Sequence, residues 1–141
     1  MSVNSVAAGQ SGVSSNVSAA LLVGRVLLSA MFILAGFAKL TAVSGTAAWF
    51  GSLGLPLPTL GAIVVGLVEL VGGLAVLVGY RTRIAAIVLA VFTVAATAIA
   101  HLDFADQMQV LLLQKNLTIV GGFIILAVIG AGALSLDARR S

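Results

Sequence analysis

One stretch constrains the fold of this chain more than any other: residues 59–78, TLGAIVVGLVELVGGLAVLV. It is apolar, contains no proline, and carries one ionisable side chain, Glu69, near its middle. As a helix, about 20 such residues cross the hydrocarbon core of a bilayer. A carboxylate at that depth is costly, so it marks either a functional site or a buried ion pair that fixes helix packing. The sequence leaves both roles of Glu69 open.

Small residues in the same stretch indicate which way Glu69 points. Steps of three or four residues connect it to Ala62, Gly66 and Gly73. Residues at this spacing share one face of a helix. Small side chains on such a face let a second helix approach closely. We therefore expect Glu69 to point into a helix bundle and not toward lipid.

The composition of the chain excludes a water-soluble domain. Of its 141 residues, 61% are hydrophobic and 8% are charged, whereas soluble domains carry about 25% charged residues. Such a chain cannot cover a surface that faces water, so we predict an integral membrane protein. The predicted architecture is all-α, an antiparallel four-helix bundle with up-down topology. Its transmembrane domain covers residues 19–134, with helices at 19–40, 59–78, 84–100 and 116–133, between a flexible tail at 1–18 and a polar tail at 135–141.

The residue types that are missing or rare exclude several kinds of chemistry. The chain has no Cys, which excludes disulfide exchange, a thiolate nucleophile and iron–sulfur ligation by this chain. With one His, a bis-His haem within one chain is impossible, and we predict no metal site. No nucleophile and base occur at a recognisable spacing, so the sequence assigns no catalytic residue. No basic cluster exceeds two residues, and we expect no nucleic-acid partner.

The distribution of cations predicts the orientation in the membrane. With four spans, both termini lie on the same side. That side holds five arginines, whereas the other side holds two lysines, Lys39 and Lys115. Because the cytoplasmic loops of membrane proteins are enriched in Lys and Arg, we predict that both termini are cytoplasmic. The two long loops, at residues 41–58 and 101–115, then face outward.

Two cations of the first predicted helix, Arg25 and Lys39, are candidate ion-pair partners of Glu69. We take the cytoplasmic membrane surface as level with Leu21 and Val78. At about 1.5 Å per residue, Glu69 then lies about 7 to 8 Å from Arg25 along the axis and about 13 to 14 Å from Lys39. We therefore predict that Glu69 pairs with Arg25. Lys39 is the second candidate, and otherwise its ammonium extends to the nearer membrane surface.

Polar residues also flank the second long loop. The third predicted helix ends, and the fourth begins, at the same membrane surface. We therefore expect His101, Lys115 and Asn116 to line one outward-facing polar pocket. In the first long loop, Trp49 and Phe50 suit the aromatic belt at the membrane interface, and a short helix lying on the membrane is compatible with that loop.

The chain resembles the DoxX family of membrane proteins. The matching stretches are GRVLLSAMFILAGFAKL, SLGLPLPTLGAIVVGLVELVGGLAVLVGYRTRIAAIVLAVF, QKNLTIVGGFIILA and GALSLD, within residues 24–137. The resemblance implies a four-helix bundle in a bacterial inner membrane. It also implies a link to membrane redox and sulfur-stress complexes, because the family's namesake is a small subunit of a thiosulfate:quinone oxidoreductase. The family-like polar positions, which become site candidates here, are Arg25, Lys39, Glu69, His101, Lys115 and Asn116.

Two classes of function follow from these residues and this resemblance. In the first, the chain is a membrane subunit or accessory of a quinone-linked oxidoreductase, binding a quinone or a sulfur oxyanion and acting with a soluble or membrane redox partner. No side chain of this chain stores an electron, so this role needs a bound quinone or a partner subunit. In the second, the chain is a non-enzymatic scaffold, assembly factor or small-solute carrier. We expect no covalently bound cofactor in either class, and a homo-oligomer is compatible with both.

Overall fold

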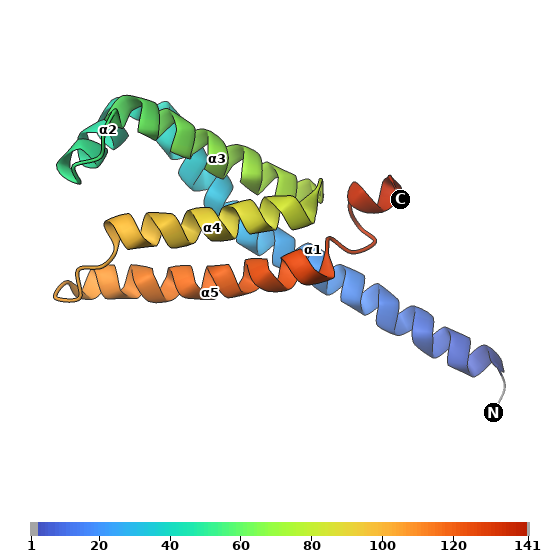
Figure 1. The fold of residues 1–141 in the computed structure, drawn as a ribbon. Helices are drawn as coiled ribbons and strands as arrows, with labels where there is room; N and C mark the ends of the chain where they lie inside the picture. Colours follow the sequence, from blue (N-terminus) through green and yellow to red (C-terminus); the bar gives the residue numbers. More distant parts are fainter. Residues whose placement is uncertain (1–2, 141) are drawn as a thin grey trace.

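The computed structural model describes the backbone of residues 3–140 and the side chains of residues 15–140. All regular structure in this part of the chain is helical. Four of the helices are long and apolar enough to cross a membrane, so the predicted all-α membrane bundle is confirmed. In chain order the elements are α1 (Val3–Thr41), α2 (Val43–Ser52), α3 (Pro58–Val78), α4 (Thr82–Ala100), α5 (Gln107–Ile129) and a short 3-10 helix, η1 (Asp137–Arg139) (Figure 1).

The four long helices pack as two pairs. Helix α1 packs mainly against α3, and α4 packs mainly against α5. Figure 1 shows α4 and α5 side by side as an antiparallel hairpin, while α1 crosses the bundle obliquely. Both chain ends lie at the end of the bundle away from α2 and the α4–α5 loop.

Two helix starts lie far from those predicted, and there are smaller differences at the start of α4, which is Thr82 and not residue 84, and at the end of α5, which is Ile129 and not residue 133. Helix α1 continues back to Val3, within the segment predicted as a flexible tail. That segment contains no proline to stop the helix. Its polar residues keep it out of the hydrocarbon, but they do not prevent it from being helical in water. Helix α5 begins at Gln107 and not at Asn116, because the side chain of Asp106 accepts a hydrogen bond from the Met108 N–H and caps the first turn.

The first long loop contains a helix of its own. Helix α2 buries Ala47 and Phe50 against Ala62 of α3. The chain then turns sharply, with Leu57 in the left-handed conformation (φ 50°) before Pro58. Proline suits the first turn of a helix, where its missing N–H costs no hydrogen bond. The predicted break at the prolines thus folds α2 back against α3.

Glycines set the contact between α1 and α3. A Cβ atom on Gly36 would lie 2.5 Å from the backbone N of Leu70 and 2.7 Å from the carbonyl O of Gly66. On α3, a Cβ on Gly73 would lie 3.0 Å from the backbone N of Ile33. No larger residue fits at either helix surface without a shift. Glycine therefore permits the backbone contact that brings these two helices together.

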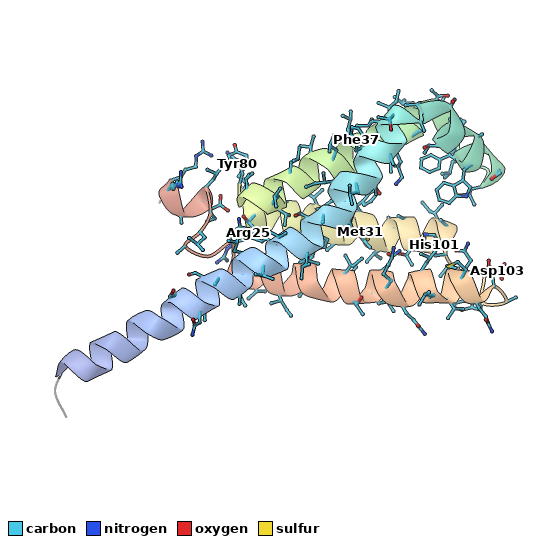
Figure 2. All side chains as sticks on the ribbon, turned by 180° about the vertical axis from the view of Figure 1, so that it is seen from behind. Arg25, Met31, Phe37, Tyr80, His101 and Asp103 are labelled. Carbon is cyan, nitrogen blue, oxygen red and sulfur yellow. The ribbon has the colours of Figure 1, made fainter. Side chains whose placement is uncertain are left out.

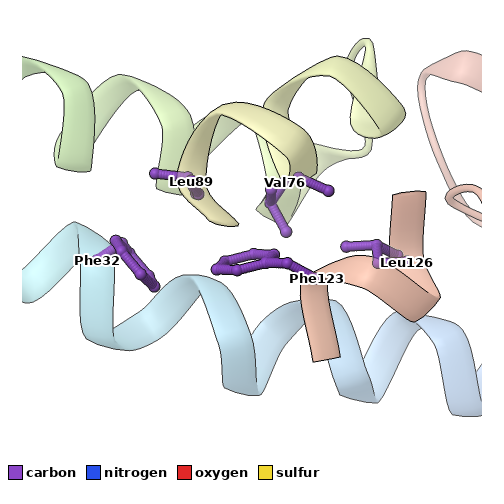
Figure 3. Packing of buried hydrophobic residues seen from close by; sticks show 6 residues of the cluster. Phe32, Val76, Leu89, Phe123 and Leu126 are labelled. Atoms are coloured by element: carbon purple, nitrogen blue, oxygen red, sulfur yellow. The ribbon is translucent and has the colours of Figure 1, made fainter. Parts of the chain in front are cut away.

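All four membrane spans contribute to the main core (Figure 3). The rings of Phe32 in α1 and Phe123 in α5 meet edge to face, with centroids 5.3 Å apart. Val76 of α3 and Leu89 of α4 complete this core, and both are fully buried. Large apolar side chains such as Phe37 are exposed on the outside. Because lipid is as apolar as these side chains, close packing and not the hydrophobic effect stabilises the bundle in a membrane.

Candidate functional site

The site begins with an ion pair inside the bundle. Lys39 Nζ lies 2.8 Å from Oε2 and 3.1 Å from Oε1 of Glu69, and it donates to both oxygens. The side chain of Glu69 is 9% exposed and that of Lys39 is 22% exposed. The prediction that Glu69 pairs with Arg25 is therefore wrong. The second candidate, Lys39, is the partner.

The glycine contacts explain why the predicted pairing failed. The depth calculation treated Leu21 and Val78 as level, but the two helices are fixed where Gly36 meets the backbone of α3 next to Glu69. Lys39 is three residues from Gly36, or about 4.5 Å along the axis. Arg25 is eleven residues away, or about 16 Å. Only Lys39 is within reach.

Arg25 instead binds backbone carbonyls at the other end of the bundle. Its guanidinium donates to Val76 O at 3.0 Å, Leu77 O at 2.8 Å, Ala131 O at 2.7 Å and Leu134 O at 2.9 Å. The residue is 1% exposed. Val76 and Leu77 belong to the last turn of α3, where carbonyls lack helical partners and carry partial negative charge. Ala131 and Leu134 lie in the segment after α5, so one buried cation joins the end of α3 to that segment. Figure 2 shows Arg25 and His101 at opposite ends of the bundle, so Arg25 lies outside the site.

The other candidate residues meet at one cavity. A cavity of about 450 Å³ lies at the end of the bundle that holds α2 and the α4–α5 loop. His101, Lys115 and Asn116 all line this cavity, and so do Lys39 and Glu69. The sequence analysis predicted the ion pair and the loop cluster of His101, Lys115 and Asn116 as two separate features. They belong to a single site. The side of the membrane to which this end of the bundle belongs stays a prediction.

Hydrogen bonds orient two of these side chains. His101 Nδ1 lies 2.6 Å from Oε1 of Gln109. An amide oxygen only accepts, so Nδ1 is the donor in this arrangement and the Nε2 of a neutral ring is an acceptor. Asn116 Nδ2 donates to Thr97 Oγ1 at 2.8 Å. The sequence reasoning missed Gln109, because it placed that residue in a loop and not in the first turn of α5.

Two aromatic side chains complete the wall of the cavity. Trp49 and Phe50 of α2 line it, with ring centroids 5.4 Å apart. The sequence assigned both to an interfacial belt, but the turn before Pro58 brings α2 over the cavity. Trp49 is 45% exposed and Phe50 is 6% exposed. The proline pair after α2 was the signal that this segment folds back.

The lining of the cavity suits a small organic ligand. Most of it is apolar, including Met31, Val65 and Phe92, and a few polar groups converge on it. Ligand sites in proteins typically have this composition and volumes of about 300 to 1,000 Å³. The described residues contain no cluster of three or more His, Asp or Glu side chains that would hold a metal ion. What the site offers is an ammonium, a carboxylate, an imidazole and an amide beside two aromatic rings that are tilted by 47° to each other.

Comparisons with known proteins agree with this architecture. The sequence profile of the DoxX family matches residues 20–102. The inner membrane protein YqjF of Escherichia coli K12 is 41% identical over 116 residues, which cover 82% of this chain and 88% of that protein. The inner membrane protein YphA of the same organism is 33% identical over 125 residues, covering 84% and 89%.

A third relative carries a name that refers to chemistry. The putative oxidoreductase CatD of Bacillus subtilis 168 is 36% identical over 72 residues, which cover 51% of this chain and 52% of that protein. No solved structure matches this chain.

Proposed function

This chain is a member of the DoxX family and a multi-pass inner-membrane protein, and from that premise we propose that its cavity binds the head group of a quinone. In this proposal the chain is a small membrane subunit or accessory of a quinone-linked redox system. The observation that carries the proposal is the convergence of a buried ion pair, an imidazole and an aromatic wall on one mostly apolar cavity. A relative that is named as a putative oxidoreductase also supports a link to redox chemistry.

The residues of the cavity fit a quinone head group in shape and in polarity. A quinone ring is flat and apolar on its faces and carries carbonyl oxygens at opposite edges. Trp49 offers a surface on which such a ring stacks. Lys39 is a hydrogen-bond donor suited to one carbonyl, and Asn116 is suited to the other. A sulfur oxyanion is a poorer fit, because the carboxylate of Glu69 balances the charge of Lys39 and repels a second anion in the same cavity.

The charged residues also suit proton exchange. Glu69 lies within hydrogen-bond distance of the ammonium of Lys39, so a proton can be shared between them or passed to a bound acceptor. His101 lines the same cavity, and with Nδ1 bound to Gln109 its Nε2 is the ring nitrogen left for a ligand. When bound, a quinone supplies the electron-accepting chemistry that the side chains lack. The electrons come from a redox partner protein.

The only tryptophan of the chain provides a direct test. Trp49 lines the cavity, so a short-chain ubiquinone or menaquinone analogue bound there should quench its fluorescence. We expect saturable quenching of the purified protein in detergent. The double variant Lys39→Met/Glu69→Leu removes both charges together and should weaken the apparent affinity about tenfold, as expected for losing a hydrogen bond to a charged group.

A matched reporter separates binding from partition into the micelle. In the variant Trp49→Phe/Phe37→Trp, the only tryptophan moves to a position on α1 that is 60% exposed in the wild type and does not line the cavity. Its quenching should rise linearly with quinone and not saturate. Linear quenching of both proteins would refute the quinone site and favour the non-enzymatic scaffold or carrier.

A further inference from the structure

A second cavity lies at the end of the bundle opposite to the candidate site. Its volume is about 560 Å³, and it lies between the start of α4 and the end of α5. Arg81, Arg83 and residues 130–132 are among the residues that line it. Neither the ion pair nor the aromatic wall of the first cavity contributes to it.

This end of the bundle is strongly positive. Five arginines lie here against one acidic residue, Asp137. The side chains of Arg81 and Arg83 are exposed. Asp137 also lines the cavity, but its carboxylate accepts the backbone N–H groups of Arg81 at 2.7 Å and Thr82 at 2.9 Å.

Arg83 is placed to present its guanidinium to a ligand. A Cβ atom on Gly130 would lie 3.4 Å from Arg83 Nε and 3.6 Å from Nη2. The guanidinium therefore lies against the backbone at the end of α5, which Gly130 ends with a φ of 90°. A guanidinium presents parallel N–H donors, a geometry that matches the oxygens of a phosphate.

The position of the cavity indicates the source of that phosphate. Span α4 begins at Thr82 and span α5 ends at Ile129, so the cavity lies at the boundary between hydrocarbon and water. Two of its lining residues, Ile84 and Ile129, are 56% and 54% exposed and offer an apolar surface on its membrane side. A ligand that fits both surfaces has an anionic head and an acyl chain.

We propose that this cavity binds the phosphate of an anionic phospholipid, with Arg83 and Arg81 as its donors. Arginines near the membrane surface attract anionic lipids by charge. Here a defined cavity adds a guanidinium packed on backbone and an apolar strip for the acyl chain. The proposal does not depend on the function of the first cavity.

Native mass spectrometry of the full chain in detergent tests this site. Phosphatidylglycerol and phosphatidylcholine with identical acyl chains are titrated in parallel, and the bound fraction and the melting temperature are recorded. We expect phosphatidylglycerol to bind and raise the melting temperature, and phosphatidylcholine to do neither. Arg83→Gln should weaken phosphatidylglycerol binding about tenfold, the size expected for one hydrogen bond between charged groups. Arg83→Lys, which keeps the charge, should weaken it less.

Arg139→Gln is the matched control, because Arg139 is exposed at the same end of the bundle but does not line the cavity. It should bind phosphatidylglycerol as the wild type does. If Arg83→Gln does not fold, Arg81→Gln replaces it and should also weaken binding. The proposal is overturned if both lipids bind equally, if Arg139→Gln loses as much affinity as the cavity variants, or if inorganic phosphate alone raises the melting temperature as much as phosphatidylglycerol.

Discussion

The two buried charges of the membrane spans are neutralised in different ways. Glu69 is balanced by an opposite charge on the neighbouring helix, whereas Arg25 is balanced by four backbone carbonyls. The carbonyls around Arg25 do not change charge, so this arrangement is suited to a fixed structural role. The pair of Lys39 and Glu69 can exchange a proton and lines a cavity, so it is suited to a ligand.

The ion pair makes a prediction for a double-mutant cycle. Lys39→Met and Glu69→Leu should each lower the free energy of unfolding by about 2 to 3 kcal/mol, because each strands the other charge. The value is below that of a fully buried pair, since Lys39 is partly exposed. The double variant should lose much less than the sum, as measured by denaturant titration in detergent. Lys115→Met, at an exposed lysine of the same cavity, is the control and should change stability by less than about 0.5 kcal/mol. Additive losses would contradict coupling between Lys39 and Glu69.

Asp137 makes a prediction for pH dependence. Although burial raises the pKa of Asp137, the N–H groups of Thr82 and Arg81 that bind its carboxylate lower this pKa below its ordinary value. A pKa that is lower in the folded than in the unfolded chain stabilises the fold above about pH 4, and this stabilisation is lost as the pH falls further. Thermal unfolding should therefore show a larger loss between neutral pH and about pH 3 for the wild type than for Asp137→Asn. Equal losses for the two proteins would refute this role.

At the scale of elements, the close approach of α1 to α3 determines which residues meet at the candidate site. The glycine contacts fix how far one helix is displaced along the other, and that displacement brings Lys39 and not Arg25 to Glu69. The turn before Pro58 then folds α2 back, which brings Trp49 to the cavity. The carboxyl-terminal segment docks on the α3–α4 turn, where Leu136 N donates to Val78 O at 3.1 Å.

The glycine contact predicts unequal effects of two identical substitutions in α1. Gly36→Ala places a Cβ against the backbone of α3, which cannot move aside as a side chain can. We expect a loss of about 1 to 3 kcal/mol in the free energy of unfolding. Gly24→Ala is the matched control, because a Cβ there has no neighbour within 4 Å, and it should be neutral or slightly stabilising. Gly36→Ala should also weaken quinone quenching of Trp49, since it displaces Lys39 from Glu69. Equal stability of the two variants would mean that the contact does not fix the helix pair.

At the scale of the whole molecule, charge is distributed unequally between the two ends of the bundle. The end with the chain termini holds five arginines and one aspartate, and the end with the first cavity holds two lysines, His101 and three carboxylates. The positive-inside rule predicts that the arginine-rich end is cytoplasmic. The candidate quinone site then opens on the outer side, and the proposed lipid site faces the inner leaflet.

Cysteine labelling of intact cells tests this orientation, because the chain has no cysteine of its own. Ala138→Cys and Ala105→Cys both alter exposed positions, one near each end of the bundle. A membrane-impermeant maleimide should label Ala105→Cys and leave Ala138→Cys unlabelled until the cells are opened. The reverse pattern would place the termini outside and would move both proposed sites to the opposite faces.

The sequence by itself determined the class of fold, because membrane spanning depends on local hydropathy and length, which are read along the chain. It also identified the ionisable residues that line the first cavity, since a group such as Glu69 is conspicuous in an apolar stretch, but it missed Gln109 and wrongly included Arg25. The starts of the helices were harder to predict from the sequence. Helix α5 begins nine residues before the predicted start, because the single capping residue Asp106 begins a helix within a polar segment.

Only the tertiary structure decided which of these residues meet. The choice of Lys39 over Arg25 depends on a displacement between helices, and a depth count from assumed membrane surfaces cannot supply it. That displacement is fixed by backbone contacts at Gly36, Gly66 and Gly73, which act across two helices at once. The union of the ion pair, the loop cluster and Trp49 in one cavity likewise depends on how three separate segments pack. Spacing along one chain records which residues share a helix face, but it does not record which faces of different helices come together.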